Sequence, residues 1–182
     1  MFINPTIAIE KRWIKGNLTL NHIQPNAIDF TLDKMFEIYK DSHCSITEFA
    51  PKKMRVQQEV PSYGLVSGHN DPSGPVKIAA GWTVGPGSYD CMSDFYVEIP
   101  EGVAAYLIVR STFNRNGMFI TSGLYDSGYK GHIGFVLHNP IGPATIEVGI
   151  RVGQIIFVSS DNAGVYAGGW NHDQGTHYSE NV

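Results

Sequence analysis

Length, composition and charge exclude several classes of protein before any motif is considered. The chain has 182 residues, 42% hydrophobic and 16% charged, which indicates one folded domain, and its 20 glycines and 10 prolines favour short strands over long helices. A net charge of −4 without a basic block argues against a nucleic-acid partner, the charged N-terminus argues against a signal peptide or membrane span, and two isolated cysteines argue against a disulfide framework.

The first predicted element is a short amphipathic helix over residues 4–16. Asn4 is a suitable cap, Pro5 fits the first helical position, and a glycine is available to end the helix. Ile9 and Trp13 are four residues apart and therefore share one face of a helix. We expect this helix to lie over a sheet.

The next predicted element is a half-buried strand that begins at Ile28. Apolar side chains alternate at Ile28, Phe30 and Leu32, which places Asp29 and Thr31 on the opposite face. An aspartate on such a face is more often solvated than functional. The following stretch, 41–75, contains four prolines and predicts irregular chain with one or two edge strands.

Strand patterns return after residue 76. Apolar runs predict strands over 78–84, 95–99 and 103–109, and the nearly continuous run of the last one is typical of a strand buried on both faces. This strand delivers Arg110, Ser111 and Thr112 at its end. An arginine followed by two hydroxyl side chains suits a phosphate-binding site. A surface arginine beside two hydroxyls in a turn is an equally good explanation of these three residues.

A tight polar turn at residues 126–128 divides the segment 123–139 into two extended runs. Asp126 at such a tip can stay ionised and hold a water molecule, and the ring of Tyr129 can cover a flat ligand. From this segment alone, a surface hairpin with a turn aspartate is the favoured explanation. Two further strands are predicted over 144–148 and 155–158, and we expect the tail from residue 161 to be mobile.

Four separated pieces of the chain together resemble one family, the trimeric dUTPase and dCTP deaminase superfamily. The pieces, in chain order, are IQPNAIDFTLD (23–33), PEGVAAYLIVRST (100–112), GLYDSGYKGHIGFVLHN (123–139) and GIRVGQIIF (149–157). The resemblance implies an all-β fold, a distorted jelly-roll-like barrel of the dUTPase type with a short N-terminal helix. It further implies a single domain over 1–182, whose tail 161–182 closes a neighbouring active site, and a homotrimer with active sites shared between subunits.

The resemblance also implies roles for individual residues around the predicted hairpin. Asp126 matches the carboxylate that positions the attacking water. Tyr129 matches the ring that packs on the deoxyribose and disfavours a 2′-hydroxyl, and Gly123 matches a glycine whose backbone lies against the pyrimidine.

A second set of residues matches the phosphate-binding motifs of the family. Arg110, Ser111 and Thr112 match the triphosphate-binding motif, and Gln154 matches the glutamine that reaches the phosphates from a neighbouring subunit. Asp29 matches an aspartate that is linked through water to magnesium. The implied cofactor is therefore Mg²⁺.

The two branches of the superfamily differ at one strand position. Deaminases of the branch that the N-terminal half resembles carry a glutamate there, which transfers protons, whereas this chain has Val136, which cannot transfer a proton. Arg115, a predicted substrate-binding residue, thereby loses the partner that it has in the deaminases. In the tail, Gln174 is retained as a substrate-binding residue although a nearby lysine of the deaminase tail is replaced by Gly169.

These features predict a dUTP diphosphatase that hydrolyses dUTP to dUMP and pyrophosphate in pyrimidine deoxynucleotide metabolism. The expected partners are dUTP or a related pyrimidine deoxynucleoside triphosphate and two further copies of the chain, with no nucleic acid and no membrane, and the expected location is cytoplasmic. Two alternatives stay open: a dCTP deaminase, perhaps one that continues to dUMP, and a nucleotide-binding protein that has lost turnover.

Overall fold

The chain folds mainly into β-strands, and the computed structural model describes residues 1–49, 53–66, 78–161 and 163–167. Three helical segments occur among these residues, α1 (Pro5–Glu10), the 3-10 helix η1 (Leu20–His22) and α2 (Ser111–Arg115). The strands are β1 (Ile14–Lys15), β2 (Ile28–Leu32), β3 (Lys34–Ile38), β4 (Gln57–Glu59), β5 (Tyr63–Val66), β6 (Ile78–Val84), β7 (Gly87–Glu98), β8 (Val103–Val109), β9 (Phe119–Thr121), β10 (Lys130–Asn139), β11 (Ala144–Glu147) and β12 (Ile150–Ser159).

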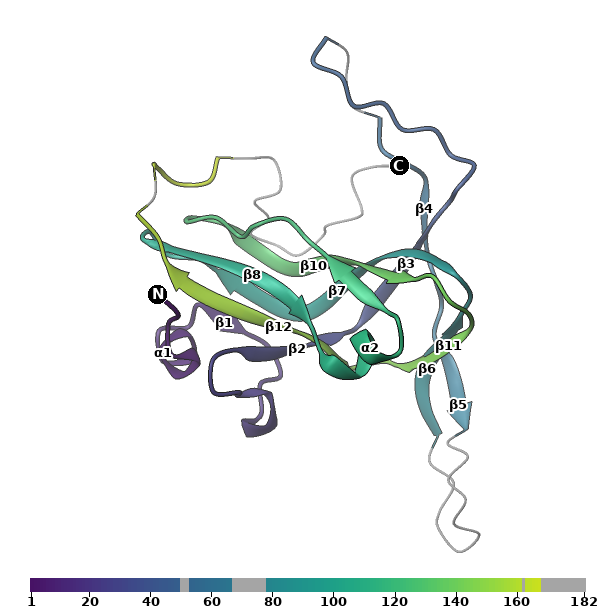
Figure 1. Ribbon diagram of the computed structural model, residues 1–182, viewed down its shortest axis with the longest axis horizontal. Coiled ribbons are helices and arrows are strands. Elements are labelled where there is room, and N and C mark those ends of the chain that lie inside the picture. Colours follow the sequence, from purple (N-terminus) through teal and green to yellow (C-terminus); the bar gives the residue numbers. More distant parts are fainter. Residues whose placement is uncertain (50–52, 67–77, 162, 168–182) are drawn as a thin grey trace, which may run out of the picture.

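Two antiparallel sheets enclose the core and form a distorted jelly-roll-like barrel (Figure 1). One sheet has the strand order β2-β12-β8, and the other has the order β4-β3-β7-β10-β9, with β1 also paired to β7. A smaller sheet consists of β11, β6 and β5. The predicted all-β class and barrel architecture are therefore confirmed.

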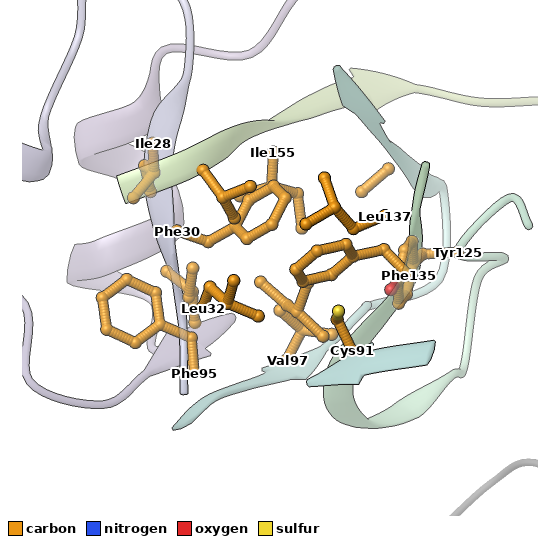
Figure 2. Close-up of a cluster of buried hydrophobic side chains, with 14 of the residues drawn as sticks. Ile28, Phe30, Leu32, Cys91, Phe95, Val97, Tyr125, Phe135, Leu137 and Ile155 are labelled. Carbon is orange, nitrogen blue, oxygen red and sulfur yellow. The ribbon is translucent and has the colours of Figure 1, made fainter. Parts of the chain in front are cut away.

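Alternating apolar side chains of β2 point into the core between the sheets (Figure 2). Ile28, Phe30 and Leu32 are fully buried, as their alternation predicted. The ring of Phe30 packs edge-on against Phe135 of β10, with ring centroids 5.2 Å apart. Because burial of one such large side chain is worth about 1.5–3 kcal/mol, this contact contributes substantially to holding the two sheets together.

The polar face of β2 is buried as well, so the expectation of a solvated face was wrong. Asp29 is fully buried and Thr31 is 7% exposed. Thr31 donates a hydrogen bond to Asp33 at 2.5 Å, and Asp29 accepts one from β12, the strand paired with β2. Buried polar groups need such partners, because an unpaired polar group in the interior is costly.

Helix α1 begins where the sequence predicted and ends earlier. The side chain of Asn4 accepts a hydrogen bond from the second helical residue at 3.0 Å, and Pro5 occupies the first position. The predicted continuation to Gly16 is wrong, because Arg12 has a positive φ of 58° that ends the helical path. The chain turns there into β1, which pairs with β7. Helix α1 packs against β12, so its predicted position over a sheet is confirmed.

Strand β8 is buried on both faces only over its first half. Val103, Ala104 and Ala105 are buried, whereas Ile108 near the other end is 40% exposed. The chain then enters α2, a second helix that the sequence interpretation did not contain. With only five residues, α2 offers no hydrophobic periodicity that could have predicted it.

A narrow two-stranded segment, residues 39–49 with 53–56, projects from the barrel beyond the β3–β4 pair (Figure 1). It carries Cys44, which is free and half-buried, whereas the free Cys91 of β7 lies in the core. The edge strands predicted in this part of the chain are present as β4 and β5. Among the described residues, no helix is both long and apolar enough to cross a membrane.

Candidate active site

The buried carboxylate of Asp29 gathers four side chains from three parts of the chain. Its Oδ1 accepts a hydrogen bond from Gln154 at 2.8 Å. Its Oδ2 lies 3.2 Å from Arg110 Nε, accepts from Arg151 Nη1 at 3.2 Å and from Gln24 at 3.4 Å. Two partly exposed arginines around one buried carboxylate leave this cluster with a net positive charge, which favours an anion.

A β-bulge in β12 brings Arg151 and Gln154 to the same carboxylate. Residues three apart on a regular strand point to opposite faces. Here the pairing with β2 shifts between Arg151 and Gly153, so one extra residue, Val152, rotates the following side chains. Gly153 is needed at this point, because a Cβ there would lie 2.3 Å from the Phe30 ring and 2.9 Å from the carbonyl oxygen of Ile108.

The cluster borders a pocket of about 420 Å³, here named the cationic pocket. Its lining residues come from the chain before β2, from β2, β8, α2 and β12, and they are Gln24, Asp29, Val109, Arg110, Ser111, Asn114 and Gln154. Arg110 is anchored at one side by Asp29 and at Nη1 by the carbonyl oxygen of Arg151 at 3.2 Å. Its guanidinium is therefore fixed while its side chain remains 28% exposed to the pocket.

The loop that carries Asp126 is fixed to the start of β8. The backbone of Tyr125 exchanges two hydrogen bonds with Ala105, at 2.8 and 2.9 Å. The hydroxyl of Ser127 donates to the carbonyl oxygen of Val103 at 2.7 Å. Gly128 has a φ of +87°, which permits the tight turn that the sequence predicted. The leading run of the predicted hairpin is thus docked on β8 through a single bridge at Tyr125, and is not paired with β10.

The carboxylate of Asp126 itself is exposed and lines a pocket of about 350 Å³, here named the Asp126 pocket. One side of this pocket is the loop with Leu124, Asp126 and Ser127. The other side is the chain after β12, with Ser160 and residues 163–166. An accessible carboxylate that lines a pocket can hold and orient a water molecule.

Tyr129 is buried beside this pocket with only 7% of its surface exposed. Its ring packs edge-on against Tyr125 at 5.1 Å and Tyr166 at 5.7 Å between centroids, and its hydroxyl donates to the carbonyl oxygen of His132 at 3.3 Å. Burial, together with the neighbouring Tyr166 and Tyr96, raises the pKa of Tyr129 to about 12. The phenol therefore stays neutral at physiological pH.

The two pockets lie at opposite ends of β8. Asp126 is attached near Val103, and Arg110 directly follows Val109. Six residues of extended chain span about 20 Å, so the two side chains are too far apart within one chain to act on the same phosphate. The two pockets, here named the half-sites, are therefore separate within one chain.

The other predicted residues are distributed over both regions. Ser111 lines the cationic pocket, whereas Thr112 lines a separate, mainly apolar pocket of about 560 Å³ beside β11. Arg115 is exposed at the end of α2, and Gly123 is exposed beside the Asp126 loop. Gln174 lies outside the described residues.

Sequence reasoning missed three side chains of the cationic cluster, namely Gln24, Asn114 and Arg151. Gln24 and Arg151 both contact Asp29, and Asn114 lines the pocket from α2. The signal for Arg151 was its place in the same short segment as Gln154. The strand period argued against it, because only the bulge brings both residues to one face.

The sequence is similar to that of known proteins over most of its length. A model described as dCTP deaminase-like matches residues 5–160. A probable deoxyuridine 5′-triphosphate nucleotidohydrolase of Halobacterium salinarum is 26% identical over 160 residues, which cover 85% of this chain and 86% of that protein. A dUMP-forming dCTP deaminase of Bifidobacterium animalis is 26% identical over 160 residues, which cover 86% of this chain and 75% of that protein.

The same fold occurs in a solved structure. The crystal structure of 2′-deoxycytidine 5′-triphosphate deaminase from Agrobacterium tumefaciens matches with a TM-score of 0.61 at 13% identity and covers 87% of this chain. The match covers 48% of that deaminase, so this chain spans about half its length. The barrel thus has the fold of that solved deaminase. The chain belongs to the dCTP deaminase-like family, whose model matches most of its length.

Proposed function

We propose that the protein is a dUTP diphosphatase that converts dUTP and water into dUMP and pyrophosphate. The observation that carries this proposal is that one chain has both a cationic pocket and a separate, accessible carboxylate. The chain also has valine at position 136, which cannot transfer a proton. A cationic pocket suits a triphosphate, and an accessible carboxylate suits the activation of water. Relatives named as nucleotidohydrolases of deoxyuridine triphosphate support the same substrate class.

The reaction needs two chains, and a homotrimer is the proposed assembly. The cationic pocket of one copy faces the Asp126 pocket of the next, which joins the half-sites that lie about 20 Å apart within a chain. Asp126 orients a water molecule and takes one of its protons. The water oxygen bonds to the α-phosphorus while the bond from that phosphorus to the bridging oxygen breaks, and pyrophosphate leaves with the electron pair.

The cationic cluster holds the phosphates during this step. Arg110 provides a fixed guanidinium, and Ser111 and Gln154 provide neutral donors at the same pocket. Asp29 does not face the substrate as a free acid, because both of its oxygens already accept N–H groups. Its role is to orient Arg110 and Gln154. Preorganised donors of this kind stabilise developing phosphate charge without reorganisation during the reaction.

Magnesium fits this site as an ion held chiefly by the substrate. The described residues contain no group of three or more His, Cys, Asp or Glu side chains that could hold a metal ion. Mg²⁺ typically keeps several waters and binds substrate phosphates with one or two carboxylates. The oxygens of Asp29 are buried and already accept N–H groups, so this residue would hold the ion only through water. The ion would supply neutralisation of phosphate charge.

Deamination of dCTP is the second candidate function, because several relatives are named dUMP-forming dCTP deaminases. Val136 provides no proton carrier, but its cross-strand partner on β7 is Asp90. Directly opposed side chains on neighbouring strands lie within about 5.5 Å of each other. Asp90 is therefore the carboxylate nearest to this position across the strands, and Asp90→Asn would test whether it carries the proton in a deaminase reaction.

A product assay separates these possibilities. The purified protein is incubated with Mg²⁺ and either dUTP or dCTP, and the nucleotides are resolved by chromatography. The proposal expects dUMP and pyrophosphate from dUTP and no product from dCTP. Formation of dUTP or dUMP from dCTP would assign the deaminase function instead, and binding of dUTP without any product would identify a nucleotide-binding protein without turnover.

A further inference from the structure

The carboxylate of Asp126 has no hydrogen-bond or ion-pair partner in the part of the chain that the structure describes. It is exposed in the Asp126 pocket, whereas its two neighbours in the chain are buried, with 6% of Tyr125 and 3% of Ser127 exposed. The direction of the carboxylate therefore depends on how the backbone is held at these neighbours. Tyr125 is held by its paired backbone hydrogen bonds with Ala105.

Ser127 continues this attachment to β8 through its side chain. Tyr125 and Ala105 form an antiparallel bridge. Two residues further along, Ser127 comes opposite Val103, and a regular ladder would join this pair through backbone N–H groups. Here the hydroxyl of Ser127 donates to the carbonyl oxygen of Val103 instead, at 2.7 Å. The side chain replaces a ladder bond at the point where the chain turns and presents Asp126 to the pocket.

The backbone of Ser127 is held by a second segment, the chain after β12. The N–H of Tyr166 donates to the carbonyl oxygen of Ser127 at 2.6 Å. The two segments also approach closely at the next residue, since a Cβ on Gly128 would lie 3.0 Å from the Cβ of Val165. The residue that follows Asp126 is therefore fixed to β8 through its side chain and to residues 165–166 through its backbone.

From these contacts we infer that Ser127 is a positioning residue, which holds the backbone so that the carboxylate of Asp126 is aimed at the attacking water. The inference rests on the proposed function and deepens it, because it concerns how the proposed base is oriented. A displacement of about 1 Å in a reacting geometry can cost roughly a hundredfold in rate. Loss of the Ser127 hydroxyl therefore lowers kcat by roughly tenfold to a hundredfold. KM for dUTP changes little, because the phosphates bind in the cationic pocket.

Steady-state kinetics with dUTP and Mg²⁺ on three variants test this role. Ser127→Ala removes the hydroxyl and lowers kcat, whereas Ser127→Thr keeps a hydroxyl on the same carbon and restores kcat. Ser93→Ala is the matched control, because Ser93 of β7 is also a buried serine with a hydrogen-bonded hydroxyl, and its partners are Thr31 and the backbone of Phe95. This control has a lower melting temperature than the wild type and the same kcat.

The contact between Ser127 and Tyr166 provides a second test. Tyr166→Pro and Tyr166→Ala both remove the ring, but only proline also removes the backbone N–H that donates to Ser127. The inference expects a lower kcat in the proline variant than in the alanine variant. If thermal melting shows that Ser127→Ala does not fold, this pair of variants decides the question, and equal kcat values in the two overturn the inference.

Amide hydrogen exchange of residues 124–130, followed by mass spectrometry, reports on the same role without turnover. Exchange is faster in Ser127→Ala than in the wild type and is unchanged in Ser93→Ala. A normal kcat or unchanged exchange in folded Ser127→Ala overturns the inference, and so does an equally low kcat in Ser127→Thr. If the wild type forms no dUMP, the proposed function fails instead, and the exchange rates alone decide whether Ser127 holds this loop.

Discussion

Gln154 and Asp29 are direct cross-strand partners, and the side-chain amide of Gln154 donates to Asp29 Oδ1 at 2.8 Å. Arg110 from the end of β8 reaches the other oxygen of the same carboxylate. The side chains assigned to the phosphates therefore share one buried anchor. A change at Asp29 is expected to affect both of them together, although Asp29 itself is fully buried.

The first prediction concerns the charge of this anchor. Asp29→Asn keeps the shape of the side chain, removes the negative charge between two arginines and turns one acceptor into a donor that faces N–H groups. The free energy of unfolding should fall by about 1–3 kcal/mol, and KM for dUTP should rise. Urea denaturation and steady-state kinetics measure the two effects. Gln24→Ala is the control, because its contact is longer at 3.4 Å, and equal losses in both variants would contradict the role of the charge.

The separation of the half-sites predicts complementation between inactive variants. Asp126→Asn and Arg110→Ala should each be nearly inactive alone. When the two are unfolded together and refolded as a 1:1 mixture, about a quarter of the sites combine an intact Asp126 from one copy with an intact Arg110 from another. The mixture should therefore recover about a quarter of wild-type activity. A mixture that stays inactive would show that both residues must come from the same chain.

The role of Asp126 as a base predicts a loss of rate without a loss of binding. Asp126→Asn keeps the size of the side chain but cannot accept the proton of the attacking water. The value of kcat should fall by about 10²–10⁴-fold while KM changes only a few-fold. Glu101→Gln, which removes an exposed carboxylate from the turn before β8, should leave both constants unchanged. Near-normal turnover in the Asp126 variant would remove this residue from the mechanism.

Stability should depend on pH through Asp33. Burial, the largest cause, and the nearby charge of Asp94 raise the pKa of Asp33 above 3.8, although hydrogen bonds from Thr31 and the Asp94 backbone oppose the shift. The unfolded chain has the ordinary pKa of 3.8 and the folded state has a higher one, so between the two values the folded state binds more protons. The stability that Asp33 contributes at low pH is therefore lost as pH rises through the folded-state pKa.

Asp33→Asn removes this titration and keeps an oxygen that can accept both hydrogen bonds, which end on the same Oδ2 atom. The melting temperature of the variant minus that of the wild type should therefore be larger at pH 7 than at pH 4. Differential scanning calorimetry at both values tests this. The exposed Asp161→Asn serves as the control, and a difference that is constant with pH would contradict the raised pKa.

The fold was largely predictable because its strands carry strong local patterns. The alternation in β2 and the apolar run of β8 each predicted a strand, and Asn4 with Pro5 predicted the start of α1. The end of α1 was not predictable, because it depends on the pairing of β1 with β7, a contact distant in sequence. Tertiary contacts of this kind override local helix signals.

Several of the predicted site residues line pockets, but their arrangement was not predictable. Arg110, Asp126 and Gln154 were each predicted as site residues, and the structure places them in two separate pockets. Their separation depends on the length of β8 and on the docking of the Asp126 loop against its first residues, which no local pattern encodes. The burial of Asp29 was missed for a related reason, since its partners come from β8, β12 and the chain before β2.

The different surroundings of the two cysteines have a practical consequence. Cys91 is fully buried and burial raises its pKa, whereas Cys44 lies partly exposed on the projecting segment 39–49. Because the thiolate is the reactive species, a maleimide dye should attach to the native protein at one position only. The unmodified sequence therefore already provides a specific fluorescent label on this segment, and energy transfer between labelled copies can report the distances between them in solution.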